Sequence, residues 1–155
     1  MQPLGEAIIE KTAGVADLYH RLALIVGPSG TGKTSAMLDL AKDNGWRYIN
    51  INLELSRRLL DLTEKQRRLR LPSVLSDVLG PIDTRPLLLD NIELLFDRTL
   101  GHDPLRLLQS LSRVHTLIVA WNGRIVGDKI VYADPNHVDY RSYLAVDLVI
   151  VDRSG

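Results

Sequence analysis

The residues best suited to chemistry lie between positions 27 and 34, where the sequence reads GPSGTGKT. A glycine, four further residues and then Gly-Lys-Thr form the phosphate-loop pattern, which joins a strand to a helix. Glycines let the backbone curl so that successive N–H groups point at a phosphate, and the following helix aims the positive end of its dipole at the same place. The pattern predicts a nucleotide-binding loop formed by Gly27, Pro28, Ser29, Gly30, Thr31, Gly32, Lys33, Thr34 and Ser35.

Two side chains of this loop have distinct expected roles. The Lys33 ammonium is expected to contact the β- and γ-phosphates, and the Thr34 hydroxyl is expected to bind Mg²⁺. The flanking residues agree with the motif, because residues 22–26 (LALIV) indicate a buried strand and residues 35–42 indicate a helix.

A second group of candidate residues follows another apolar run. Asp90 ends residues 86–90 (PLLLD), and Glu93 comes three positions later. In phosphate-loop NTPases an acidic residue at such a strand end helps to hold Mg²⁺, and a nearby glutamate can polarise the attacking water as a general base. The alternative interpretation is structural: Asp90 caps the next helix, and Glu93 is its capping-box partner.

Two further residues are candidates for contact with the nucleotide. Asn122 follows the expected strand at residues 116–121, where its side chain could contact the γ-phosphate or orient water. The alternative for Asn122 is the first position of an Asn-Gly turn. Arg141 precedes the last expected strand, a position from which an arginine could reach the nucleotide of a neighbouring subunit. Otherwise Arg141 is an ordinary surface arginine.

Strands that alternate with helices predict an α/β fold with three layers and a mainly parallel sheet, in which ligands bind at the carboxyl ends of the strands. The spacing of apolar residues between positions 4 and 19 is near-helical, and this segment is expected to cover an edge of the sheet. The remaining expected elements are strands at residues 22–26, 46–52, 86–90, 116–121 and 146–151, helices at 35–42, 105–113 and 135–141, and half of a hairpin at 129–132.

A basic stretch lies between these elements. Residues 54–70 contain six Lys and Arg against three Asp and Glu. The stretch from Arg57 to Arg70 could contact the DNA backbone or an acidic partner. The alternative is a solvated amphipathic helix whose core-facing residues are Leu59, Leu60, Leu62 and Leu69.

Composition limits the remaining possibilities. The 155 residues are 45% hydrophobic and 25% charged, which predicts one globular domain over residues 1–155. The formal net charge is zero, so no global field attracts nucleic acid or membrane, and the absence of cysteine excludes disulfide and thiol chemistry. We expect a cytoplasmic protein, since neither a signal peptide nor a membrane-spanning run is present.

Several segments together resemble the BrxF family of small phosphate-loop proteins, which are components of type III BREX bacteriophage-defence systems. The resemblance spans nearly the whole chain. The segments that carry it are residues 27–34, 52–60 (NLELSRRLL), 88–93 (LLDNIE), 103–109 (DPLRLLQ) and 119–123 (VAWNG).

This resemblance implies an ATP-binding, Mg²⁺-dependent component of a defence complex that acts with a DNA methyltransferase and other large partners. It also implies an AAA+-like core, with Lys33 and Thr34 on nucleotide and metal, and with Asp90 and Glu93 as the acidic pair. AAA+ proteins usually continue into a helical lid that carries another arginine, and no such lid is expected here. The site would then be completed by neighbouring subunits, as in a homo-oligomer.

Three functions are compatible with these features. The first is an ATPase or an ATP-gated switch within a defence complex. The second is a small kinase of nucleotide or metabolite type, although a glutamate placed for water favours hydrolysis. The third is a scaffold that binds nucleotide without hydrolysis and contacts DNA or a partner protein.

Overall fold

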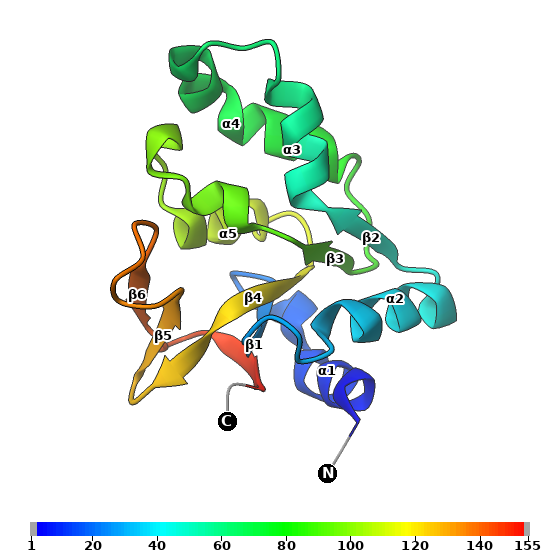
Figure 1. Ribbon diagram of the computed structural model, residues 1–155. Helices are drawn as coiled ribbons and strands as arrows, with labels where there is room; N and C mark the ends of the chain where they lie inside the picture. The colour runs from blue at the N-terminus through cyan, green and yellow to red at the C-terminus, as the bar shows by residue number, and fades with distance from the viewer. Residues whose placement is uncertain (1–2, 154–155) are drawn as a thin grey trace.

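A twisted sheet with a parallel centre organises residues 3–153, the part of the chain that the computed structural model describes (Figure 1). Its central strands lie in the order β2–β3–β4–β1–β7, and every neighbouring pair among them is parallel. Their bounds are β1 (Leu22–Gly27), β2 (Arg47–Asn50), β3 (Leu87–Asp90), β4 (Leu117–Val126) and β7 (Val149–Asp152). The predicted α/β fold with a mainly parallel sheet is confirmed.

Helices cover both faces of this sheet and make three layers. Successive strand residues point to opposite faces, so the two faces bury different residues of the same strand. Ile25 and Ile118 pack with α1 (Leu4–Thr12) and α2 (Lys33–Asn44). Leu24 and Val119 pack with the core formed by α3 (Ile51–Leu59), α4 (Glu64–Leu79) and α5 (Pro104–Leu111). In Figure 1, α3 and α4 stand together beyond β2 and β3.

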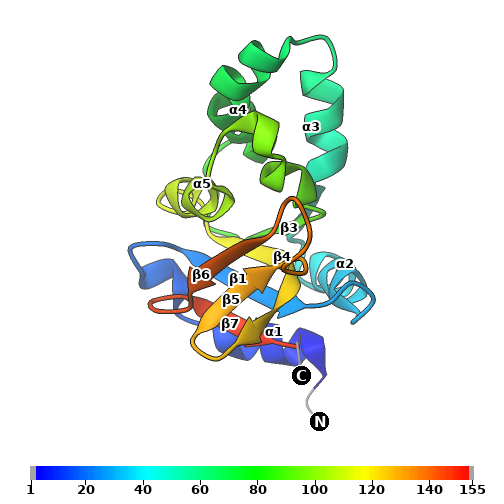
Figure 2. The same cartoon turned by 60° about the vertical axis from the view of Figure 1, so that its left-hand side comes forward.

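An antiparallel ribbon extends the far end of β4. In it β4 pairs with β5 (Lys129–Tyr132), which pairs with β6 (Arg141–Leu144), as Figure 2 shows. Phe96 anchors the ribbon by stacking on Tyr132 with ring centroids 3.6 Å apart, and the Trp121 indole donates a 3.0 Å hydrogen bond to the Val131 carbonyl. Phe96 belongs to the 3₁₀ helix η2 (Glu93–Phe96). The expected hairpin at residues 129–132 is therefore confirmed.

The second strand is shorter than predicted. The expected strand at residues 46–52 ends at Asn50, because the Asn50 side chain accepts a hydrogen bond from the Leu53 N–H and begins α3. Asparagine at this position satisfies one of the free N–H groups of the first helical turn. Asn52 consequently lies on a helix rather than in the sheet.

The basic stretch forms parts of two helices instead of one. Helical structure is interrupted between Leu59, the last residue of α3, and Glu64, the first residue of α4. At the start of α4, Thr63 and Gln66 make a reciprocal capping box. The prediction that Leu60 and Leu69 face the core is wrong, since each is 70% exposed. The break shifts the apolar face of α4 to a different set of residues, namely Leu71, Leu75, Val78 and Leu79.

Three other expected elements differ from the structure. The expected turn at Asn122 is wrong, because β4 continues to Val126 and the chain reverses at Gly127, whose φ is 62°. The expected helix at residues 135–141 is absent from the described residues, and Arg141 begins β6. The near-helical segment at 4–19 is helical to Thr12, and a 3₁₀ helix, η1 (Val15–Asp17), follows Gly14. Helix α1 packs against β7, the strand at one edge of the sheet, as expected.

Gly123 provides a test of the position where β4 changes from parallel to antiparallel pairing. A Cβ atom at this position would overlap the Val131 carbonyl of β5. We expect Gly123→Ala to lower the free energy of unfolding by roughly 3 kcal/mol, because the backbone must shift to relieve the overlap. Urea denaturation measures this change. Gly5→Ala, whose added methyl group has its nearest neighbour at 4.0 Å in a helix, is the matched control and should be neutral or slightly stabilising.

Candidate nucleotide-binding site

The phosphate loop lies between the carboxyl end of β1 and the start of α2. Gly30 and Gly32 adopt left-handed backbone conformations, with φ values of 85° and 87°, which residues with a Cβ atom adopt at a cost. The loop borders a cavity of about 330 Å³ that also reaches the end of β3 and the middle of β4. The cavity is lined by Ser29, Gly30, Gly32, Lys33, Thr34, Ser35, Asp90, Asn91 and Asn122.

Lys33 holds the loop in a compact conformation. Its ammonium donates hydrogen bonds of 2.6 and 2.7 Å to the carbonyl oxygens of Gly27 and Pro28, and lies 3.3 Å from the Thr31 hydroxyl. The residue is 5% exposed, and this burial lowers the pKa of its amine, while the negative charges of Asp90 and Glu93 act in the opposite direction. The loop therefore contains a buried cation that favours an anionic ligand, with two carboxylates nearby.

Asp90 receives three hydrogen bonds from three different segments. Its Oδ2 accepts from the Thr34 hydroxyl at 2.6 Å and from the Tyr48 hydroxyl at 2.7 Å, and its Oδ1 accepts from the Asn91 N–H at 2.9 Å. Asp90 is 4% exposed. The structure thus brings together Thr34 and Asp90, the two residues predicted to hold the metal. Burial and the hydrogen bond to Asp90 raise the pKa of Tyr48 well above its ordinary value.

These two oxygen ligands fit Mg²⁺. This ion is usually held by one or two carboxylates together with phosphate oxygens and water, rather than by a cage of protein ligands. Within residues 3–153 no cluster of three or more His, Cys, Asp or Glu residues could hold a metal ion. A hydroxyl and a carboxylate beside a phosphate loop therefore suit an ion that obtains its other ligands from a nucleotide.

Glu93 lies between two side-chain amides. One carboxylate oxygen accepts a short hydrogen bond from the Asn122 Nδ2, and the other accepts from the Asn52 Nδ2 at 3.1 Å. The side-chain oxygen of Asn52, Oδ1, in turn accepts from the Leu94 N–H at 2.8 Å. Glu93 is therefore held between α3 and β4. The capping-box alternative is wrong, because the N-cap residue of η2 is Ile92, whose side chain makes no capping hydrogen bond.

Tyr48 and Asn52 are the site residues that sequence reasoning missed. Both belong to the segment at residues 46–52, for which the sequence predicts a strand. The polar character of its end was a usable signal, since ligand sites collect polar residues at the carboxyl ends of parallel strands. The contact of Tyr48 with Asp90 follows from the register of β2 on β3, in which Asn50 is opposite Asp90 and Tyr48 is opposite Leu88.

The predicted arginines lie outside the phosphate cavity. Arg141 begins β6 opposite Tyr132, and its Nη1 is shielded from solvent without a hydrogen-bond partner in the described part of the chain. Within the basic stretch, Arg67 donates to the carbonyls of Leu59 and Leu62 at the end of α3. Arg68 binds Glu64 and the Thr99 carbonyl. Two arginines of this stretch therefore already make hydrogen bonds within the molecule. DNA contact by the stretch stays a prediction.

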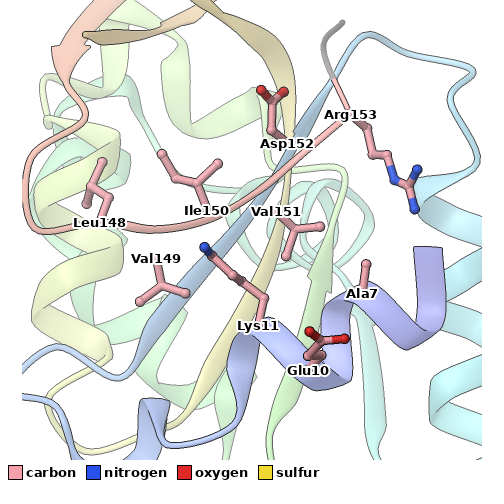
Figure 3. Close-up of a pocket in the computed structure, with 9 residues that line it drawn as sticks. All are labelled: Ala7, Glu10, Lys11, Leu148, Val149, Ile150, Val151, Asp152 and Arg153. Carbon is pink, nitrogen blue, oxygen red and sulfur yellow. The ribbon is translucent and has the colours of Figure 1, made fainter. Parts of the chain in front are cut away.

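A larger hollow lies at the edge of the sheet formed by β7. It measures about 750 Å³ and is bordered by Ala7, Glu10 and Lys11 of α1 and by residues 148–153 around β7 (Figure 3). None of these residues belongs to the phosphate loop, to the end of β3 or to η2. The candidate nucleotide site is consequently the smaller cavity beside the loop.

No helix within residues 3–153 is both long and apolar enough to cross a membrane.

No protein-family model matches the chain, and no curated protein matches it significantly. Among solved structures, C. elegans PCH-2 matches with a TM-score of 0.43 and 20% sequence identity. The match covers 81% of this chain but 38% of the PCH-2 chain, so this chain spans well under half the length of that protein.

Tyr48 gives the site a pH dependence that can be measured. Its pKa is raised in the folded protein above the ordinary value of 10.0, so the folded state resists a deprotonation that the unfolded chain undergoes. The stabilisation is therefore complete below pH 10 and is lost as the pH rises above it. We expect the unfolding free energy of Tyr48→Phe to fall less steeply between pH 9 and 11 than that of the unchanged protein, by up to about 1.4 kcal/mol per pH unit.

Urea titrations at several pH values measure this difference in slope. Tyr19→Phe is the matched control, because Tyr19 is 69% exposed and precedes β1, whereas Asp90 lies at the carboxyl end of the parallel strand β3. Equal slopes for Tyr48→Phe and Tyr19→Phe would contradict the role assigned to the Tyr48–Asp90 hydrogen bond.

Proposed function

We propose that this chain binds ATP with Mg²⁺ and hydrolyses the bond to the terminal phosphate. The observation that carries the proposal is the 2.6 Å contact between the Thr34 hydroxyl and the Asp90 carboxylate, directly beside the phosphate loop. A buried strand-end carboxylate next to the loop threonine supports Mg²⁺ binding at this point. When bound, Mg²⁺ would neutralise charge on the β- and γ-phosphates.

Glu93 is the proposed general base. Its carboxylate has about four positions for hydrogen bonds, and the amides of Asn52 and Asn122 occupy two of them. The remaining positions are able to accept a proton from water. The two amides also fix the orientation of the carboxylate, so that Glu93 need not reorganise when water is activated.

Lys33 provides the main electrostatic attraction for the phosphates. Its ammonium binds the carbonyls of Gly27 and Pro28, and a phosphate would replace these neutral acceptors by charged oxygens. Hydrogen bonds between charged groups are about twice as strong as neutral ones. The burial that lowers the pKa of Lys33 adds to the preference for an anionic ligand, since a desolvated cation gains most from a counter-charge.

The biological setting that we propose is a BREX-type defence complex with an AAA+-like ATPase component. This proposal rests on the resemblance of residues 52–60 and 103–109 to the BrxF family. The partners would be other components of the defence system, and neighbouring copies of the chain could supply further residues to the site. Turnover distinguishes the two alternatives from an ATPase. A kinase would transfer the terminal phosphate to a metabolite, and a scaffold would bind ATP without turnover.

Lys33→Ala tests the nucleotide site. We expect it to reduce ATP affinity by about 100-fold or more, because the variant lacks the buried ammonium that faces the phosphates. Isothermal titration calorimetry with ATP and Mg²⁺ measures the affinity. Lys42→Ala is the matched control, since Lys42 is an exposed lysine of the same helix. Unchanged affinity in Lys33→Ala would rule out the phosphate loop as the binding site.

Glu93→Gln tests hydrolysis separately from binding. We expect kcat to fall by about 100- to 10,000-fold while ATP affinity changes little, because the variant cannot accept a proton. Phosphate release measures turnover, with and without DNA and across a series of protein concentrations. Glu64→Gln is the control, because the Glu64 side chain is 67% exposed at the start of α4. Persistent turnover in Glu93→Gln would mean that the base is another group.

A further inference from the structure

A second cavity adjoins the nucleotide cavity on one side of the phosphate loop. It measures about 300 Å³, and it shares Ser29 and Asn122 with the first cavity. Its other boundaries are the start of the loop, the continuation of β4 and the segment after β5. The residues that line it are Pro28, Ser29, Asn122, Gly123, Arg124, Ala133 and Asp134.

The shared residues show which end of a nucleotide this second cavity would face. In the proposed function Glu93 activates the water that attacks the terminal phosphate, so the terminal phosphate must lie next to Glu93. Asn122 binds Glu93 directly and lines both cavities. The second cavity therefore begins on the terminal-phosphate side.

Arg124 is the cation in this second cavity. It follows Asn122 by two positions on β4, so the two side chains point to the same face of the strand and their Cα atoms are about 7 Å apart. Arg124 is exposed, and within residues 3–153 its side chain makes no hydrogen bond or ion pair. By contrast, Arg98 donates to the carbonyls of Val138 and Tyr140 in a structural contact.

The position of Arg124 relative to the loop is fixed by packing. Gly27 is the register partner of Asn122 across the β1–β4 pair, and Arg124 is the partner of Val131 across the β4–β5 pair. The Val131 carbonyl accepts from the Trp121 indole, and the ribbon is anchored on Phe96. The backbone at Arg124 is thus tied to the strand that begins the phosphate loop.

We propose that Arg124 binds the γ-phosphate of ATP within the same subunit. This inference rests on the proposed function and assigns to Arg124 the charge-stabilising role that Arg141 was predicted to fill from a neighbouring copy. A guanidinium has five donors in a planar fork that suits two phosphate oxygens, and a free arginine gives up no existing contact when it turns towards them. Since ADP lacks the γ-phosphate, Arg124 discriminates ATP from ADP.

The first experiment compares affinities for ADP and for a non-hydrolysable ATP analogue. In Arg124→Ala we expect analogue affinity to fall about 10-fold or more while ADP affinity stays within about twofold, because the lost contact involves the γ-phosphate alone. The turnover rate should fall by about 1,000-fold. Lys129→Ala is the matched control, since Lys129 is an exposed cation of the same ribbon that lines neither cavity. Equal effects of Arg124→Ala on both ligands, or none on either, would overturn the proposal.

The second experiment separates action within one subunit from action between subunits. Arg124→Ala is mixed with Lys33→Ala, so that each variant lacks a different part of the site. If Arg124 acts in its own subunit, the mixture stays as inactive as its components. Recovery of turnover on mixing would show action between subunits and would overturn the assignment.

The unchanged protein distinguishes this proposal from the function beneath it. If it binds neither ADP nor the analogue, the proposed nucleotide site itself fails. If it binds both, and Arg124→Ala leaves their affinity ratio unaltered, the Arg124 proposal alone fails.

Discussion

The register of three parallel strands is the constraint on which the site depends. β4 lies between β1 and β3, and the pairing of Gly27 with Asn122 and of Leu89 with Val119 brings the ends of β1 and β3 beside the middle of β4. There the phosphate loop follows β1, Asp90 ends β3 and Asn122 continues β4. A slip of one residue in any pair would turn these side chains to the opposite face. In this register the Thr34 hydroxyl donates a hydrogen bond to the Asp90 carboxylate.

Glu93, the candidate base, is also contacted by α3, a helix that contributes no residue to the phosphate loop. Asn52, in the first turn of α3, binds both the Glu93 carboxylate and the Leu94 N–H, and its own N–H donates to the Asn91 carbonyl. Any displacement of α3 would therefore alter the surroundings of Glu93. Because α4 packs against α3, the outer part of the helical layer contacts the helix that holds Glu93.

Contiguous features were readable from the sequence, and features formed across space were not. The glycines and the lysine of residues 27–34 lie in one continuous segment, so their spacing alone predicts a phosphate loop. The position of α5 was also clear, since Asp103 caps the helix and Pro104 occupies its first position. Tyr48 meets Asp90 only because β2 pairs with β3, which no local pattern records.

The incorrect predictions arise where another interaction overrides a local sequence preference. Leucines at 60 and 69 fit a single amphipathic helix, but the capping box at Thr63 divides that helix and rotates its second half. Asn-Gly favours a turn locally, yet pairing of Gly123 with Tyr132 keeps the chain extended. In both places a distant or competing hydrogen bond overrides the local preference.

The strand order also has a consequence for how the chain folds. β1 is the strand next to the phosphate loop, and both of its neighbours come much later in the chain: Leu22 pairs with Leu117, and Ala23 pairs with Val149. During synthesis β1 therefore emerges from the ribosome long before either partner exists, and its apolar residues stay unpaired in the sheet until those partners follow. Such long-range pairing slows folding, because loop-closure entropy is lost before the contacts form. The part of the sheet that bears the phosphate loop is therefore complete only after β4 and β7 have been synthesised.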